Sequence, residues 1–189
     1  MPISVVTPAT ALALDVSDAD DHLRGLYADD STHLNRMIWA AAAYIEADSG
    51  IALIDTVYDE TFACWDRWSK HRLSRSPLDT LTSVKYYDTD EAEQTWADTN
   101  YLTTGVPEIE IAPDISLPSV STRQYPWTVR YTAGYGTAST DVPHTVQQAM
   151  RIIIEDWDRF RGNFATGTIT APVAIGVRRL LALTDPGAL

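Results

Sequence analysis

The most regular alternation of apolar and polar residues in this chain covers positions 127–132. A period of two with aromatic and β-branched residues is typical of a strand that has one buried face. The residues on that face would be Trp127, Val129 and Tyr131. Gly134 and Gly136 end the pattern, because glycine adopts backbone turns that other residues resist. We therefore expect a strand that ends in a glycine turn.

A long helix is predicted after this turn, over about residues 143–161. Asp141 is the expected N-cap, and Pro143 falls in the first turn, where a missing N–H has no cost. The main apolar face carries Val146, Ala149, Met150, Ile153, Trp157 and Phe160 at helical spacing. Ile152 and Ile154 lie off this face, so the helix should be buried on several sides. Either a large core of the same chain or a neighbouring subunit would explain this, and Ile152, Ile154 and Trp157 are the candidate subunit contacts.

The first fifty residues predict an extended arm and two helices. Residues 1–14 contain few turn signals and are expected to form the arm. A short helix should begin near Ser17, which together with Asp20 resembles a capping box, and its apolar stripe would consist of Val16, Ala19, Leu23 and Leu26. A second helix should start at Asp29 or Asp30, because Asp accepts hydrogen bonds from free N–H groups, and should end at Gly50. Its apolar face would comprise Leu34, Met37 or Ile38, Ala41 or Ala42, and Ile45.

The pattern changes to short strands over residues 52–132. Five or six strands are expected, among them 56–62, 83–87, 100–104 and 108–112. The acidic segment 88–91 predicts a hairpin connection between two of them. Several prolines punctuate this section, and proline favours sheet edges and loops. A polar loop at 163–171 and a last short helix at about 172–183 follow the long helix.

These elements predict an α+β fold in a single domain of 189 residues. About four helices would form the core, within about 17–50 and 143–183. The strand-rich section, about 52–135, would be an insertion, and residues 184–189 a C-terminal tail.

Composition narrows the class of protein. One cysteine cannot form an internal disulfide framework, and no apolar run approaches the length of a membrane span. The N-terminus lacks the basic start and apolar core of a signal peptide, so we expect a soluble cytoplasmic protein. A net charge of −12 is unfavourable for gripping nucleic acid, whose affinity depends on lysine and arginine. The acidity either keeps the protein soluble or lets DNA pass without sticking.

Candidate chemical groups do not form a recognisable active site. The four histidines, His22, His33, His71 and His144, lack the spacing of metal ligands. Cys64 is expected to be a buried thiol in a strand, because no base near it in the sequence would activate it. The acidic residues near 18–21 and 29–30 are expected to be helix starts. Residues 88–93 lack the glycine of a calcium loop and should form a solvated turn.

Two further segments have alternative interpretations. Gly134 and Gly136 stand between a strand and a helix, where phosphate loops occur, but the remaining motif is missing, which favours a plain turn. A basic cluster of Arg67, Lys70, His71, Arg72 and Arg75 could contact phosphate, or an acidic neighbour or solvent, which the chain's acidity favours. We therefore expect no catalytic, cofactor-binding or metal-binding residues and no enzymatic activity.

Several short motifs occur in a defined order along the chain. They are His-Leu-Arg at 22–24, Asp-Asp at 29–30, Tyr-Ile-Glu-x-x-Ser-Gly at 44–50, Leu-Ser-Arg-Ser-Pro-Leu at 73–78, Ser-Val-Lys-Tyr-Tyr-Asp at 83–88, Val-Arg-Tyr-Thr-Ala-Gly-Tyr-Gly at 129–136, Val-Pro at 142–143 and Gly-Val-x-x-Leu-Leu at 176–181. In order and spacing, over about residues 12–183, they resemble the head–tail connector proteins (adaptor or head-completion proteins) of tailed phages and gene transfer agents.

The resemblance implies a structural subunit in the neck of a virion or virus-like particle, made in the bacterial cytoplasm. Such subunits form a ring of about twelve copies that docks on the portal protein and meets a stopper or tail-terminator protein on the other side. Double-stranded DNA passes through the lumen without sequence-specific binding, and no cofactor or membrane is involved. In the family the C-terminal segment docks on the portal, which here would be Leu183, Thr184, Asp185, Pro186, Gly187, Ala188 and Leu189. The alternative is a small soluble binding or regulatory module that works as a monomer or dimer.

Overall fold

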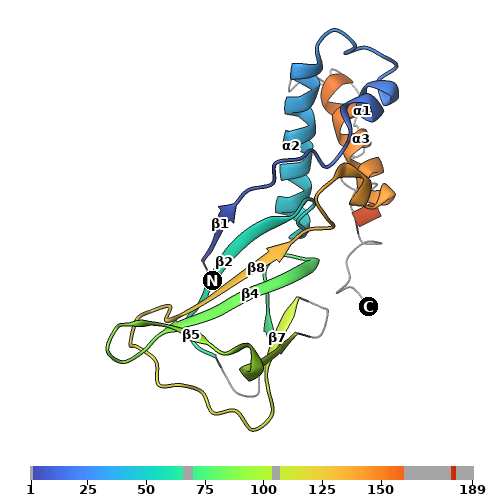
Figure 1. The fold of residues 1–189 in the computed structure, drawn as a ribbon. Coiled ribbons are helices and arrows are strands. Elements are labelled where there is room, and N and C mark those ends of the chain that lie inside the picture. The colour runs from blue at the N-terminus through green and yellow to red at the C-terminus, as the bar shows by residue number, and fades with distance from the viewer. Residues whose placement is uncertain (1, 66–69, 104–106, 160–179, 182–189) are drawn as a thin grey trace, which may run out of the picture. The chain divides into compact units, whose positions relative to one another are not determined.

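The structure, a computed structural model, describes residues 2–65, 70–103, 107–159 and 180–181. The chain divides into two compact units (Figure 1). The strand unit consists of residues 1–9 and 55–134, and the helical unit consists of residues 10–54 and 135–189. Each unit is therefore built from segments that are distant in the sequence.

The strand unit contains a five-stranded antiparallel sheet with the order β1-β2-β8-β4-β5. Its strands are β1 (Ile3–Thr7), β2 (Thr56–Phe62), β4 (Leu78–Tyr87), β5 (Glu93–Trp96) and β8 (Trp127–Ala133). β2 and β8 pair without a register shift over their whole length, although about seventy residues separate them in the sequence. A second, three-stranded sheet has the order β3-β7-β6, with β3 at His71–Arg72, β7 at Glu108–Ile111 and β6 at Tyr101–Thr103, after the 3₁₀ turn η1 (Asp98–Asn100).

The alternation in β2 and β8 places one face of the large sheet in a core. Both strands alternate strictly between buried and half-buried positions, as the sequence pattern predicts. The rings of Trp65, Trp96 and Trp127 lie edge to face in this core, with centroids 5.2–5.5 Å apart. Three of the six tryptophans therefore pack inside the strand unit.

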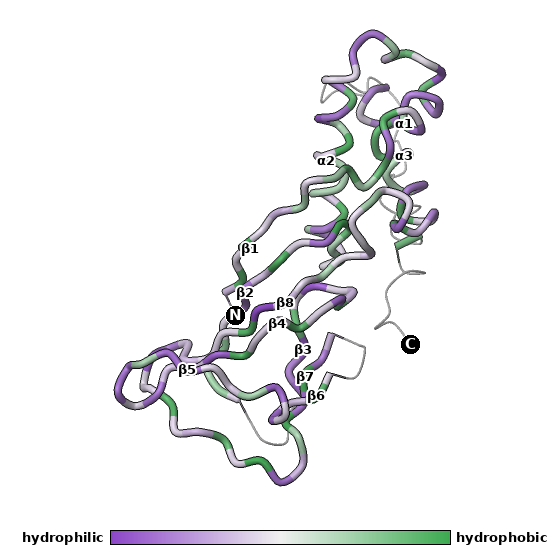
Figure 2. The backbone as a smooth tube through the Cα atoms, viewed as in Figure 1, coloured by the Kyte–Doolittle hydropathy of each residue, from purple (hydrophilic) through white to green (hydrophobic). Residues whose placement is uncertain are grey.

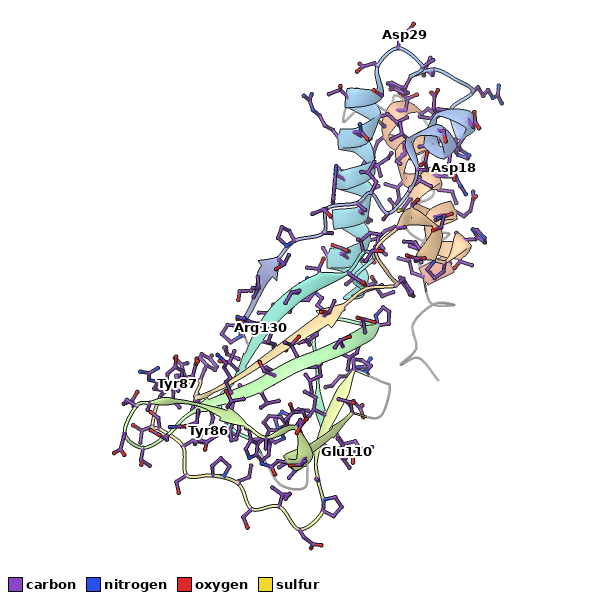
Figure 3. The ribbon with its side chains drawn as sticks, in the orientation of Figure 1. Asp18, Asp29, Tyr86, Tyr87, Glu110 and Arg130 are labelled. Atoms are coloured by element: carbon purple, nitrogen blue, oxygen red, sulfur yellow. The ribbon has the colours of Figure 1, made fainter. Side chains whose placement is uncertain are left out.

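The opposite face of the same sheet is polar. Arg130 on β8, labelled in Figure 3, donates two hydrogen bonds to the carboxylate of Asp59 on β2, at 2.7 and 2.6 Å. Lys85 on β4 pairs with Glu93 on β5 at 2.7 Å. Hydrophilic residues are also frequent in the hairpin that joins β4 and β5 and in the turn between α1 and α2 (Figure 2).

The helical unit contains α1 (Val16–His22), α2 (Ser31–Ser49) and α3 (His144–Arg159), with the 3₁₀ turn η2 (Ser139–Asp141) before α3. For α2 the sequence predictions are confirmed. The Asp30 side chain accepts a hydrogen bond from the His33 N–H at 3.1 Å and caps the helix, and Gly50 ends it in a left-handed conformation with φ 73°. The predicted apolar face is buried: Leu34, Met37, Ile38, Ala41, Ala42 and Ile45.

α1 begins close to the predicted position, but its predicted capping pair is wrong. Asp15, not Ser17, is the N-cap: its carboxylate accepts from the N–H and the hydroxyl of Ser17. Asp20 instead accepts from the N–H of Tyr27 at 2.8 Å and closes the turn that follows. Leu26, expected in the apolar stripe of this helix, lies in that turn and is 61% exposed.

The predicted N-cap of α3 is also wrong. The carboxylate of Asp141 accepts from the N–H of Ala138 at 3.0 Å, because η2 lies between Asp141 and the helix. The N–H groups of Val146 and Gln147, in the first turn of α3, donate to the carbonyl of Pro143. The helices and sheets together confirm the predicted mixed α and β fold class.

Three further differences concern which segments form elements. The described residues contain three α-helices rather than about four. The helix expected at 172–183 lies outside the described residues except for Leu180 and Leu181, which are helical, and the 163–171 loop lies outside them entirely. Residues 3–7, expected in an extended arm, form strand β1 at one edge of the large sheet.

Candidate functional site

The polar groups that sequence analysis considered for chemistry have structural partners. The histidine neighbours are Glu155 for His22 (3.1 Å), the Tyr27 ring for His33 (5.4 Å), the Phe62 and Trp65 rings for His71 (5.2 and 4.8 Å) and Gln147 for His144 (3.3 Å). Among the described residues, no group of three or more His, Cys, Asp or Glu side chains is placed to hold a metal ion.

Cys64 is exposed, so the prediction of a buried thiol in a strand is wrong. β2 ends at Phe62, and the alternation of buried positions ends with it. Trp65, one residue further on, occupies the buried place in the aromatic core. The thiol is left on the surface of the strand unit.

The acidic segment after β4 is a hydrogen-bonded turn. Asp88 accepts from the N–H groups of Asp90 and Ala92, at 2.9 and 3.0 Å, and from the Gln94 side chain at 2.8 Å. These bonds, that from Gln94 above all, hold the pKa of Asp88 below its ordinary value. The segment does connect two antiparallel strands, as predicted, but the second of them is β5, which was not among the named expected strands.

The long connection of residues 112–126 contacts the tip of this hairpin at several points. The Arg123 guanidinium lies 3.9 Å from the centre of the Tyr87 ring and also pairs with Glu91. The hydroxyl of Ser121 donates to Glu91, and its N–H donates to the Tyr87 carbonyl at 2.8 Å. Glu91 adopts a positive φ of 63°, which a non-glycine residue takes at some cost. Tyr87 is labelled in Figure 3.

Of the basic cluster, Lys70 meets acidic residues of the same chain. Lys70 pairs with Glu110 at 2.6 Å and lies 3.9 Å from Glu108, both on β7. The pairing with Glu110 raises the pKa of Lys70 above its ordinary value. Arg75 lies over the Tyr58 ring, 5.9 Å from its centre. Arg67 lies outside the described residues.

The two glycines after β8 make a tight backbone turn. Both have positive φ, 156° at Gly134 and 149° at Gly136. A Cβ at Gly134 would lie 2.5 Å from the backbone nitrogen of Asp55, and one at Gly136 would overlap the Asp141 carboxylate. The space beside them is thus filled by the chain itself, which agrees with the expected plain turn.

A buried acidic residue, Glu60, was not predicted from the sequence. Glu60 on β2 is 0% exposed. Its carboxyl group accepts from the Tyr131 hydroxyl at 2.8 Å, from the Ser74 N–H at 3.0 Å and from the Ser74 hydroxyl. The Glu60 position in the strand alternation indicates an inward side chain, but nothing in the sequence identifies Ser74 as its partner.

The residues proposed as subunit contacts differ in exposure. Trp157 is 36% exposed and Ile152 is half-buried, but Ile154 is only 1% exposed within one copy of the chain. Ile154 is thus covered by its own chain, which agrees with the expectation that α3 is buried on more than one side. The C-terminal residues 183–189 lie outside the described residues.

Two exposed aromatic residues on α2 were not identified from the sequence. Trp39 is 43% exposed and Tyr44 is 47% exposed. The Tyr44 ring meets the Trp157 ring of α3 edge to face, with centroids 6.3 Å apart. Both lie outside the buried Leu34–Ile45 stripe, and large aromatic residues outside such a stripe are the signal that would have found them.

Comparison with solved structures identifies the fold. The chain superposes on a protein from the neck of an empty GTA (gene transfer agent) particle, computed with C6 symmetry, with a TM-score of 0.76 and 23% identity, over 95% of both chains. It matches a chain from the virion of a native GTA particle with a TM-score of 0.77 and 24% identity, again over 95% of both. A third match, from the neck of a native GTA particle computed with C12 symmetry, has a TM-score of 0.75 and 25% identity, over 95% of this chain and 94% of the other.

The sequence comparisons give a different result, since no protein-family model and no curated protein matches the chain. Among the described residues, no helix combines the length and apolar composition that crossing a membrane requires. The order of motifs that resembles head–tail connectors is thus accompanied by agreement in three dimensions along nearly the whole chain. The chain has the fold of a protein of the gene transfer agent particle neck, as its resemblance to head–tail connector proteins predicts.

Proposed function

We propose that this chain is a structural head–tail connector (adaptor) subunit of a phage-like particle, located in the neck between capsid and tail. The observation that carries the proposal is the match to the native GTA neck, at 25% identity and a TM-score of 0.75 over 95% of the chain. A match over the whole length argues for a shared role more strongly than a shared motif, because every element must be kept in order.

The subunit acts as one member of a closed ring. Two of the matching neck structures were computed with six-fold and twelve-fold symmetry. Rotational symmetry of this kind requires each copy to contact its neighbours through two different surfaces. Trp157 and Ile152 of α3 belong to one such surface in this proposal.

The ring joins three partners. Its C-terminal residues 183–189 dock on the portal, and a stopper or tail-terminator protein binds the other side. Double-stranded DNA passes through the lumen. A chain with a net charge of −12 suits such a channel, because acidic side chains outnumber the lysine and arginine residues that would bind DNA phosphates. The role is geometric and needs no catalysis.

Electron microscopy of the purified chain mixed with the portal protein of the same particle tests the proposal. We expect a closed ring of this chain on one end of the portal. Matched mixtures contain each protein alone, because a ring that needs the portal as a template appears only in the combined sample. A chain that stays monomeric or dimeric and leaves the portal bare would contradict the proposal and favour the regulatory module.

A further inference from the structure

Helix α2 is apolar on both sides over its central part. Every residue from Met37 to Ile45 is apolar or aromatic. The inner side of this stretch is buried within the helical unit, as described above. The outer α2 face, which we define by its exposed members, consists of Trp39, Ala40, Ala43, Tyr44 and Ala47.

The outer α2 face is unlike an ordinary solvated helix surface. A surface helix normally carries charged residues opposite its buried stripe. Here the exposed charged residues Arg36 and Asp48 lie only at its two ends. Trp39 and Tyr44 are of the residue types that dominate the centres of protein interfaces. This combination indicates a surface that is covered in the assembled protein.

The face continues onto α3. The edge-to-face contact of Tyr44 with Trp157 joins the outer α2 face to the exposed tryptophan of the neighbouring helix. Trp157 is part of the subunit contact proposed above, so the two surfaces form one patch. The patch has a tyrosine hydroxyl and two indole groups but no basic residue in its centre, which suits a protein partner better than an anionic membrane or a nucleic acid.

We propose that the outer α2 face, together with Trp157, is the contact surface for a second copy of this chain in the ring. The inference rests on the proposed function and adds the surface through which it works. A rotationally symmetric ring requires such a surface on every copy, and the outer α2 face is continuous with Trp157. The contact is between unlike surfaces, so the patch meets a different part of the next copy.

The test compares two double variants of the full chain. Trp39→Ser with Tyr44→Ser removes two of the three large side chains of the patch and leaves Trp157 in place. Leu26→Ser with Leu102→Ser is the matched control, because it removes two exposed apolar side chains elsewhere, 61% and 49% exposed. Ring assembly on the portal is titrated by electron microscopy. We expect the patch variant to need at least about tenfold more protein for half-maximal ring formation, and the control to behave as the wild type.

Crosslinking identifies the occupant directly. A photoreactive benzoylphenylalanine in place of Tyr44 should give a product of twice the subunit mass in assembled rings. A crosslink to the portal, to a tail protein or within the same chain would overturn the inference. This measurement also decides the case if the double variant fails to fold, which circular dichroism would reveal.

Failure of the inference differs from failure of the proposed function. If the wild type forms rings and the patch variant forms them at the same concentration, the inference is wrong and the connector role stands. If the wild type forms no ring with its portal, the proposed function fails and the inference fails with it.

Discussion

The carboxyl group of Glu60 illustrates how single residues stabilise the strand unit. It lies on the core side of β2, where leaving a polar group without partners would be unfavourable. Ser74, in the connection between β3 and β4, and Tyr131 on β8 supply its hydrogen bonds. One buried side chain therefore joins the sheet to a loop. Its neighbour Asp59 points to the opposite face and pairs with Arg130.

Replacing Glu60 by methionine should lower the free energy of unfolding by about 2–4 kcal/mol. The variant keeps the length of the side chain but leaves the Ser74 N–H and the Tyr131 hydroxyl without an acceptor. Glu60→Gln should lose less, because the Ser74 hydroxyl can rotate and accept from the new amide. Urea unfolding measures both. Asp59→Asn is the control on the same strand, with an expected loss of about 1 kcal/mol or less. Equal losses for Glu60→Met and Asp59→Asn would contradict the argument.

The Tyr131 hydroxyl makes stability depend on alkaline pH. Burial, and then the nearby Glu60 carboxyl group, raise the pKa of Tyr131 above its ordinary value of about 10. Because the pKa of Tyr131 is raised in the folded chain, the contribution of its neutral hydroxyl to stability is complete below pH 10. It is lost as pH rises further, because only the unfolded chain then releases the proton. The expected loss is about 1.4 kcal/mol per pH unit.

Tyr131→Phe removes this ionisation. The variant should be less stable than the wild type near pH 8, because Glu60 loses a donor. The difference between the two proteins should shrink between about pH 10 and 11.5, as measured by urea unfolding at each pH. Parallel pH profiles for the two proteins would show that Tyr131 does not contribute in this way.

At the level of elements, sequence patterns identified the segments that bury one regular face. β2, β8 and α2 were predicted with nearly their observed bounds, because alternation or helical spacing is strict in each. β1 was missed because its burial pattern has no alternation: four of its five residues are exposed. β5 was missed because it is short and mainly polar. Both are edge strands, and their pairing depends on partners far away in the sequence or across a turn.

Gly134 is an element boundary at which only glycine fits. It follows β8 directly, and its N–H donates to the carbonyl of Pro77 at 3.1 Å, just before β4. In Gly134→Ala the new methyl group would collide with the backbone of Asp55, at the start of β2. We expect thermal unfolding to show that the free energy of unfolding falls by about 2–4 kcal/mol, because alanine is strained at this positive φ and the strand is displaced.

Gly25→Ala provides the matched control. Gly25 also has a positive φ, 72°, but no atom lies within 4 Å of the added Cβ. The loss there should be only about 1–2 kcal/mol, which is the conformational cost alone. If the two variants are equally destabilised, the close approach at Gly134 has no energetic role.

At the scale of the whole molecule, the sequence carried information on fold but little on assembly. The chain passes between its two units three times, near residues 9, 54 and 134, and no composition change marks the first of these crossings. For Ile154, helical spacing left open whether its own chain or a neighbouring copy covers it, and the structure shows that its own chain buries it. Trp39 and Tyr44 were overlooked because an apolar run is ambiguous until the structure shows which side is left exposed.

The C-terminal tail should matter for the assembled neck and not for the fold of the subunit. Removing residues 182–189 should leave folding unchanged, because the cut follows Leu181, which is buried, 6% exposed, and stays in place. Under the proposed docking, binding to the portal should weaken at least about tenfold, because the apolar side chains and the proline of this segment are removed. Circular dichroism and thermal unfolding check the fold, and sedimentation with the portal measures binding. A variant in which glycine and serine replace the same residues separates chain length from side-chain chemistry: it should bind as poorly as the deletion. Undiminished portal binding by either variant would show that the connector docks through another surface.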